Sequence, residues 1–224
     1  MKVASKAKGR LQVLALINCV KITDDGLLRV VALNPHITKL HVPGCTSLSP
    51  VGVVTAVKLL SKNNHKLKVL QINGIQGIQK EELETLHNLI NQGQTQQKIG
   101  KILYHEYNKF STLEHIETNH PIDVDICPKC NEVRIVFDCP RVSCQKCRGC
   151  DLCITRCIEC GICITSTQEL EEASCSDTLC LECWLKLPKC SYCNKPYCNK
   201  HADQQHRVSG SVGFVCATCH SRFN

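Results

Sequence analysis

The sequence is poor in aromatic residues and has no long apolar run. Phe, Trp and Tyr make up 4% of the 224 residues, and Trp184 is the only tryptophan. No stretch of about eighteen apolar residues occurs, which excludes a transmembrane helix. Residues 11–20 are apolar and follow a basic start, but no Ala-x-Ala-like site follows them. A cleavable signal peptide is therefore not predicted.

Signatures of common enzymes and of secreted proteins are also missing. The chain has no Asn-x-Ser/Thr sequon, no Gly-rich phosphate loop, no His-Glu-x-x-His and no Ser-His-Asp order. These absences argue against glycosylated secreted proteins, nucleotide-binding enzymes, zinc peptidases and serine hydrolases. We therefore predict a non-catalytic protein.

Cysteine, in contrast, is abundant. Eighteen of the 20 cysteines lie between Cys127 and Cys219, and they form nine overlapping Cys-x-x-Cys pairs. Cys198-x-x-His201 is a tenth, mixed pair. Two intervening residues allow a tight turn to aim both side chains at one tetrahedral zinc ion. This region is therefore predicted to bind several zinc ions, and a thiolate-rich donor set favours closed structural sites over catalytic ones.

Three other uses of cysteine are weaker. A disulfide scaffold is disfavoured because adjacent Cys-x-x-Cys residues make poor structural bridges and the chain is long for such a domain. A redox enzyme needs one such pair, not nine. The run from Cys144 to Cys153 is similar to a bacterial ferredoxin motif, but its last gap is two residues and Ile154 follows where that motif has proline.

The predicted ligands are enough for about five four-coordinate sites, so we expect four to five structural zinc ions. Two of the cysteines, Cys139 and Cys175, stand outside any pair, and His120 and His220 are possible substitutes. The full predicted set is Cys127, Cys130, Cys139, Cys144, Cys147, Cys150, Cys153, Cys157, Cys160, Cys163, Cys175, Cys180, Cys183, Cys190, Cys193, Cys198, His201, His206, Cys216 and Cys219.

The net charge depends on the metal. The formal charge is +7. Eighteen thiolates and about five Zn²⁺ ions change it to 7 − 18 + 10 = −1. Lys146, Arg148 and Arg156 lie near the dense cysteine run, but acidic residues lie close by. Nucleic-acid binding through zinc knuckles therefore remains only a second alternative, which requires binding that weakens steeply with salt.

Before the cysteines, three segments share one pattern. Leu11-x-x-Leu14-x-Leu16-x-x-Cys19 recurs from Ile37 to Cys45 and from Leu67 to Ile75, with starts 37 − 11 = 26 and 67 − 37 = 30 residues apart. The leucine-rich repeat has this pattern and a period of about 20 to 29 residues. The predicted fold class is therefore a short α/β leucine-rich repeat solenoid of about three repeats, followed by a small irregular multi-zinc region.

Each repeat strand is followed by a predicted helix. The apolar positions are Leu27, Val30, Val31 and Leu33 in the first helix, Val53, Val54 and Val57 in the second, and Leu83, Leu86, Leu89 and Ile90 in the third. Ser49-Pro50 supplies an N-cap with proline at the first helical position. Cys19 and Cys45 are expected to be buried thiols at the turns after the strands, not zinc ligands.

We predict three segments: leucine-rich repeats over 1–90, a helical connector over 91–120 and the zinc region over 121–224. Ile99, Ile102, Leu103, Tyr107 and Phe110 recur at helical spacing in the connector. This apolar face is expected to cap the open end of the repeats. A partner-binding helix is the alternative.

Together these motifs resemble a known family. The segment Leu14–Leu27, the segment His41–Cys45 and the C-terminal cluster that begins Cys127-Pro-Lys-Cys130 resemble plant F-box proteins of the SKP1-interacting-partner group. The resemblance implies a substrate-recognition subunit of an SCF-type ubiquitin ligase. In this family an F-box bundle binds a SKP1-like adaptor and the cullin assembly. The residues before Leu11 are too few for an F-box, so we expect the chain to be a fragment and adaptor binding to need an upstream segment.

The resemblance also implies a recognition surface for a protein substrate on the strand face of the repeats. Strand residues between the leucines point out of the core. The residues expected on this surface are Gln12, Thr38, His41, Lys68 and Gln71.

The first alternative is a RING-like domain that acts directly as a ubiquitin ligase. Pairing Cys180/Cys183 with Cys198/His201, and Cys190/Cys193 with Cys216/Cys219, would give a cross-braced fold. Trp184 would then contact a ubiquitin-conjugating enzyme, although packing against the zinc turns is the simpler role. Under every alternative, thiol-rich zinc sites require a reducing compartment, which predicts the nucleus or cytoplasm.

Overall fold

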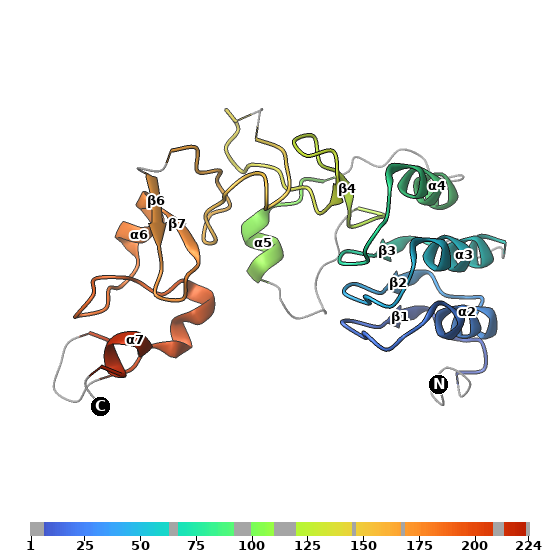
Figure 1. Cartoon of the computed structure of the whole chain (residues 1–224), viewed down its shortest axis with the longest axis horizontal. Helices are drawn as coiled ribbons and strands as arrows, with labels where there is room; N and C mark the ends of the chain where they lie inside the picture. Colours follow the sequence, from blue (N-terminus) through green and yellow to red (C-terminus); the bar gives the residue numbers. More distant parts are fainter. Residues whose placement is uncertain are drawn as a thin grey trace. The chain divides into compact units, whose positions relative to one another are not determined.

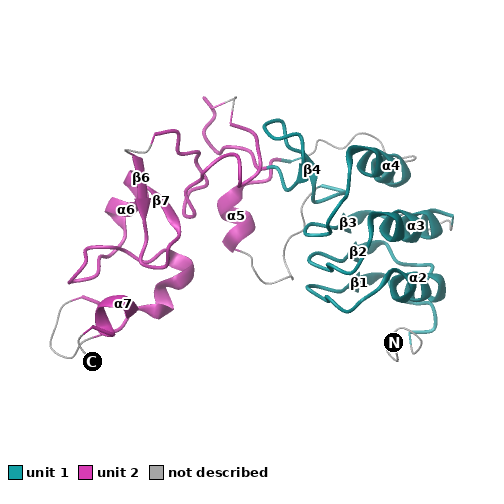
Figure 2. Ribbon diagram, viewed as in Figure 1, with its two compact units in different colours: residues 1–100, 117–136 teal, residues 101–116, 137–224 magenta. Residues whose placement is uncertain are grey.

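The computed structural model of the chain describes residues 7–62, 67–91, 100–109, 120–144, 147–166, 169–207 and 213–222. The chain divides into two compact units, coloured separately in Figure 2. Unit 1 comprises residues 1–100 and 117–136, and unit 2 comprises residues 101–116 and 137–224.

Unit 1 is a mixed α/β structure in which three strand–helix segments follow one another. The strands pair in parallel in the order β1-β2-β3, and Leu14, Leu40 and Leu70 are register partners. Three helices lie side by side along one side of the strands (Figure 1). In chain order the elements are β1 (Val13–Ala15), α2 (Asp24–Leu33), β2 (Lys39–His41), α3 (Pro50–Ser61), β3 (Val69–Gln71) and α4 (Lys80–Asn91).

The core of unit 1 is aliphatic. The central strand residues Leu40 and Leu70 are fully buried. Cys45 is also fully buried, and its thiol donates a hydrogen bond to the Leu16 carbonyl over 3.0 Å, whereas Cys19 is half-buried. The helices contribute the predicted residues Leu27, Val30, Val31, Val53, Val54, Val57, Leu83, Leu86 and Ile90. Leu33, however, is 57% exposed, because it is the last residue of α2 and lies beyond the turn that packs.

Side-chain caps fix where the first two helices begin. The Thr23 hydroxyl accepts a hydrogen bond from the Gly26 N–H, and the Ser49 hydroxyl accepts one from the Gly52 N–H. Asp24 joins neighbouring segments, because its carboxylate accepts hydrogen bonds from the Ser49 N–H at 2.9 Å and from the Ser49 hydroxyl at 2.6 Å. A Cβ on Gly52 would lie 2.1 Å from the Asp24 carboxylate, so this close approach requires glycine.

The free edge of β3 is covered by the chain that leads to the cysteines. The Leu70 N–H donates to the Pro121 carbonyl, and the Asp123 N–H donates to the Leu70 carbonyl. The buried Asp123 carboxylate then accepts the N–H groups of Ile72 at 2.8 Å and Asn73 at 3.1 Å. Asp123 thereby satisfies two backbone donors at the end of the strand that would otherwise have no partner.

The structure describes part of the predicted connector, residues 100–109. Its described helix is short, α5 (Tyr104–Lys109), and belongs to unit 2. Tyr104 and Tyr107 pack edge-on against Phe137 of that unit, at centroid distances of 5.2 and 5.6 Å. Ile102 and Leu103 precede this helix, and Ile99 and Phe110 lie outside the described residues. The edge of β3 is thus capped by residues 121–123 rather than by the connector helix.

Regular structure is sparse after the helical segments. Unit 1 ends with the hairpin β4 (Asp125–Ile126) and β5 (Val133–Arg134). Unit 2 has the hairpin β6 (Leu170–Glu172) and β7 (Thr178–Cys180), and the short helices α6 (Leu181–Lys186), η2 (Asn199–Gln204) and α7 (Ala217–His220). In the described ranges, no helix combines the length and the apolar character needed to cross a bilayer.

Candidate metal centres

Among the described residues, unit 2 brings fourteen of its sixteen cysteines into four groups that could hold metal ions. Within each group the ligand atoms all lie within 4.8 Å of one another. Three groups consist of cysteine alone, and the fourth mixes donor types. Group A is Cys139, Cys144, Cys147 and Cys163; group B is Cys157, Cys160, Cys180 and Cys183; group C is Cys190, Cys193, Cys216 and Cys219; and the mixed group is Cys175, Asp177, Cys198 and His201.

The sulfur spacing fits tetrahedral zinc. Four thiolates at about 2.3 Å from one ion lie about 3.8 Å from each other. The Sγ atoms of Cys144 and Cys163 are 3.5 Å apart. Those of Cys160 and Cys180 are 3.8 Å apart, and those of Cys193 and Cys216 are 3.7 Å apart. A disulfide needs about 2.05 Å, and all 20 cysteines are free.

The first pair of groups B and C lies on a tight turn, and Cys127 of unit 1 begins a turn of the same kind. In each turn the carbonyl of the first cysteine accepts the N–H of the residue four positions later, at 2.8 to 3.0 Å. That fourth residue has a positive φ: Asn131 at 60°, Gly161 at 72° and Asn194 at 58°. Because only glycine and asparagine adopt this conformation at low cost, these residues allow the turn to close.

The second pair of each of these groups starts a helix. Cys180 is the N-cap of α6, Cys216 is the N-cap of α7, and Cys198 precedes η2 in the mixed group. The Cys216 sulfur accepts the N–H of Cys219 at 3.4 Å. Unpaired N–H groups at a helix start favour a negatively charged sulfur, which is the form that binds metal.

Thiolates are favoured at two of the turns. Hydrogen bonding from the Cys160 thiol and from backbone N–H groups lowers the pKa of Cys157 to about 5, despite its burial. Burial raises the pKa of Cys190, but the N–H groups of Cys193 and Cys216 outweigh this and lower it to about 6. The pKa of Cys160, which donates to Cys157, is raised. A divalent cation would replace the protons that these thiols share.

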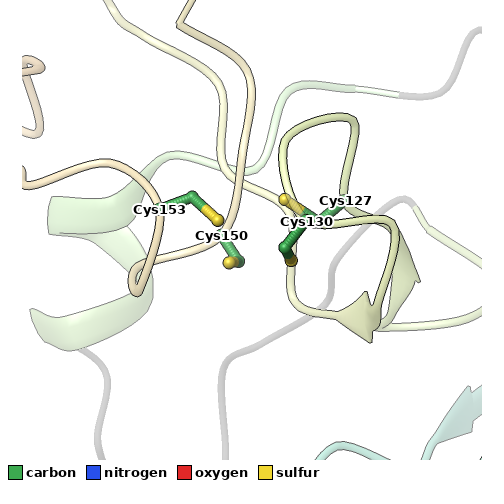
Figure 3. Close-up of side chains that lie close together, drawn as sticks. All are labelled: Cys127, Cys130, Cys150 and Cys153. Atoms are coloured by element: carbon green, nitrogen blue, oxygen red, sulfur yellow. The ribbon is translucent and has the colours of Figure 1, made fainter.

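Two further Cys-x-x-Cys pairs complete the predicted cysteine set, and Figure 3 shows them. Cys127 and Cys130 belong to unit 1, on the turn that follows β4, and Cys150 and Cys153 belong to unit 2. Cys127 and Cys150 are fully buried, whereas Cys153 is exposed. Each pair offers two sulfur atoms, which is half of a four-coordinate donor set.

The mixed group contains a donor that the sequence analysis missed. Asp177 Oδ2 lies 3.3 Å from the Cys175 sulfur and 3.0 Å from the Cys198 sulfur. It also lies 3.0 Å from Nδ1 of His201. Burial raises the pKa of Asp177, but hydrogen bonds from the two thiols outweigh this and hold its pKa below the ordinary value. In the sequence, Asp177 could have been found from Cys175, which belongs to no Cys-x-x-Cys pair and has this carboxylate two residues after it.

His206, the remaining predicted ligand, belongs to none of the groups formed by the described residues. Its ring instead stacks on that of His220, with centroids 4.4 Å apart. His120, a suggested substitute, lies 2.6 Å from the Gly100 carbonyl through Nε2. These histidines follow no Cys-x-x spacing, unlike His201.

The cross-brace proposed for a RING-like domain is half wrong. Cys190/Cys193 does meet Cys216/Cys219, but Cys180/Cys183 meets Cys157/Cys160 and not Cys198/His201. Trp184 is half-buried within the apolar cluster around Leu179. The Lys189 ammonium lies 4.3 Å above its ring and also donates to the Trp184 carbonyl. Trp184 therefore has a packing role in unit 2.

The strand-face residues of unit 1 have different environments. Gln12 and Lys68 are exposed, and Thr38 and His41 are half-buried. Gln71, which was expected to point to solvent, is only 6% exposed. The reason is that residues 121–123 cover the edge of β3. Burial lowers the pKa of His41, so the imidazole is neutral at neutral pH.

Asn194 tests the turn of group C. Replacing it with valine should weaken metal binding there about tenfold or more, because a β-branched residue at φ 58° costs about 1–2 kcal/mol. Asn194→Gly should bind normally, since glycine adopts this conformation freely. Metal binding by both variants would be measured as the rate of metal release to a colorimetric chelator. Equal release from Asn194→Val and wild type would contradict this account of the turn.

The chain is similar to F-box proteins of Arabidopsis thaliana. It is 42% identical to F-box protein SKIP28 over 98% of this chain and 70% of that protein. It is 35% identical to F-box protein SKIP14, over 84% of this chain and 43% of that protein. Identity to F-box protein At3g27290 is also 35%, over 75% of this chain and 47% of that protein. Residues 123–192 match the family described as At3g27290 F-box protein C-terminal domain. No solved structure matches the chain.

Proposed function

The chain belongs to the plant F-box protein family that includes F-box protein SKIP28, and we propose that it acts as a substrate-recognition subunit of an SCF-type ubiquitin ligase. The observation that carries this proposal is the similarity to F-box protein SKIP28 over nearly the whole chain. In this proposal the protein binds a partner and directs it to ubiquitin-dependent degradation. A SKP1-like adaptor and a cullin are partners in this proposal only if an F-box precedes this chain.

The proposed recognition element is a leucine-rich repeat solenoid in unit 1. Three parallel strands with matched leucines support it, at separations of 40 − 14 = 26 and 70 − 40 = 30 residues. Each strand is followed by a helix, as stacked repeats require. We also propose the division of the chain into leucine-rich repeats over 1–90, a helical connector over 91–120 and a zinc region over 121–224.

The proposed contact surface begins with a row of residues across the strands. The Thr38 N–H donates to the Gln12 carbonyl, and the Lys68 N–H donates to the Thr38 carbonyl, both at 2.7 Å. These bonds align Gln12, Thr38 and Lys68 side by side. His41 would extend the surface, whereas the burial of Gln71 makes it a minor contributor.

Unit 2 is proposed to bind four zinc ions, within the four to five expected from the sequence. The role proposed for zinc is structural, with unit 2 as a rigid second contact surface. The Lys189 ammonium lies over the Trp184 ring. This contact disfavours the RING-like alternative, because there the Trp184 ring would contact a ubiquitin-conjugating enzyme. Reduced thiolate sites support a location in the nucleus or cytoplasm.

Variants of the strand row test this function in plant cells. The tagged chain is expressed with the proteasome inhibited, and bound proteins are compared between wild type and Thr38→Arg/Lys68→Glu. Lys80→Glu on the exposed helix side is the matched control, because its pairing with Glu84 at 3.9 Å is a weak surface contact. We expect the double variant to lose a partner that wild type and Lys80→Glu both retain.

The half-life of that partner decides the role in degradation. It should lengthen at least twofold, with loss of its ubiquitin conjugates, in cells that lack the gene encoding this chain. An unchanged half-life would overturn the recognition-subunit proposal even if binding were confirmed.

A further inference from the structure

We propose that Asp177 is the fourth ligand of a zinc site in the mixed group, beside two cysteines and one histidine, and that this site releases its metal before the all-cysteine groups. The inference rests on the structural zinc in the proposed function and makes it specific. It assigns a carboxylate ligand within unit 2, gives one metal site a different chemistry from its neighbours, and predicts an order of metal loss.

The geometry supports a shared centre. Asp177 Oδ2 lies 3.0 to 3.3 Å from the donor atoms of Cys175, Cys198 and His201. The Cys198 sulfur is itself 3.1 Å from Nδ1 of His201. Oxygen and nitrogen ligands at about 2.0 Å from zinc and sulfur at about 2.3 Å are separated by about 3.3 to 3.5 Å. The four atoms therefore lie close to the corners of one coordination tetrahedron.

Each donor comes from a segment that is fixed in position. Cys175 and Asp177 lie in the hairpin turn between β6 and β7, where the Ala173 N–H donates to the Asp177 carbonyl at 2.9 Å. The hairpin is held by the Ser174 N–H, which donates to the Pro196 carbonyl at 2.7 Å. On the other side, Glu159 accepts the Asn199 N–H at 2.6 Å, beside Cys198.

Donor chemistry separates this site from its neighbours. Four thiolates and Zn²⁺ carry −4 + 2 = −2, whereas two thiolates, one carboxylate and a neutral imidazole with Zn²⁺ carry −3 + 2 = −1. Thiolate is the softer ligand and holds zinc more strongly than a carboxylate oxygen does. The side chains of His201 and Asp177 are also 30% and 29% exposed, so a chelator can reach them, while Cys157 and Cys180 of group B are buried. Group C has an exposed ligand of its own, Cys193, so for that group the expected order of metal loss rests on the donor chemistry.

The order of residues along the chain gives this site a linking position. Cys175 and Asp177 lie between the two pairs of group B, and Cys198 and His201 lie between the two pairs of group C. β7 connects Asp177 directly to Cys180 of group B. Metal bound in the mixed group therefore joins the loops of groups B and C, and its loss would free both loops while their own ions remain.

Chelator challenge of the zinc-loaded full chain tests the proposal, with zinc counted by native mass spectrometry. Wild type should lose one ion at least tenfold faster than the others. Asp177→Asn should lose that ion about tenfold faster still or carry one ion fewer. Asp177→Cys should retain it at least tenfold longer, because a third thiolate replaces the carboxylate. Asp203→Ala, an exposed carboxylate two residues after His201, is the control and should match wild type.

Cobalt substitution gives an independent readout. Asp177→Cys adds one thiolate to the cobalt, so the sulfur-to-cobalt charge-transfer absorption should increase by the contribution of one cobalt–thiolate bond. Asp203→Ala should leave this absorption unchanged. If the Asp177 variants release metal as wild type does, Asp177 is only a hydrogen-bond acceptor and the inference is overturned, although the all-cysteine sites stand. If the loaded chain binds no zinc, the structural-zinc part of the proposed function fails instead.

Discussion

Removal of zinc is expected to unfold unit 2 and to leave unit 1 folded. The reason is that the apolar clusters of unit 2 are built largely from the cysteines themselves. One cluster contains Cys190, Cys216 and Cys219 beside Tyr197 and Phe214. In another, every buried member is a cysteine: Cys139, Cys147 and Cys163. Cores of this size supply little stability alone, whereas a structural zinc ion contributes on the order of 10 kcal/mol.

The position of Trp184 allows the two units to be followed separately in the full chain. Trp184 is the only tryptophan and packs in unit 2, so its fluorescence reports on that unit. The long helices α2, α3 and α4 all lie in unit 1 and dominate the far-UV circular dichroism. After chelation under reducing conditions, the Trp184 emission should shift to that of an exposed indole while most of the helical signal remains. Unchanged emission from a chain shown to be free of metal would contradict the prediction.

The sequence indicated those parts of the fold that depend on local pattern. The leucine spacing predicted β1, β2 and β3 because buried strand positions recur whenever a strand–helix segment repeats. The cap at Ser49 was visible because an N-cap is a contact within a few residues. Most of the grouped ligands were likewise visible, since Cys-x-x-Cys is itself a local geometry.

What the sequence did not indicate depends on contacts between distant segments. Asp123 was missed as the cap of β3 because its two N–H partners lie about 50 residues earlier in the chain. The burial of Gln71 follows from the same contact. Asp177 was overlooked because a carboxylate two residues from a cysteine has no motif of its own. The partition of the cysteine pairs into groups was equally hidden, since every pair has the same local spacing.

Asp123→Ala is expected to lower the free energy of unfolding of unit 1 by on the order of 3 kcal/mol. The substitution leaves the N–H groups of Ile72 and Asn73 without their acceptor, and each buried unpaired donor costs about 1–3 kcal/mol. Urea unfolding followed by far-UV circular dichroism would measure this, with Trp184 emission as a check that unit 2 is unaffected. Asp25→Ala, an exposed carboxylate in the first turn of α2, should cost less than about 1 kcal/mol.

The pH dependence gives a second measurement at the same residue. Burial raises the pKa of Asp123 from 3.8 to about 6, against the lowering effect of its backbone N–H donors. Because the folded pKa is the higher one, the folded state binds the proton more tightly, and the stability that this proton confers is lost as pH rises from about 4 to about 6. Relative to Asp123→Asn, whose amide does not titrate, wild type should therefore be about 1 kcal/mol more stable at pH 5 than at pH 7. A difference between the two proteins that stays constant over this range would show that the carboxyl is ionised throughout, and that the N–H groups of Ile72 and Asn73 outweigh its burial.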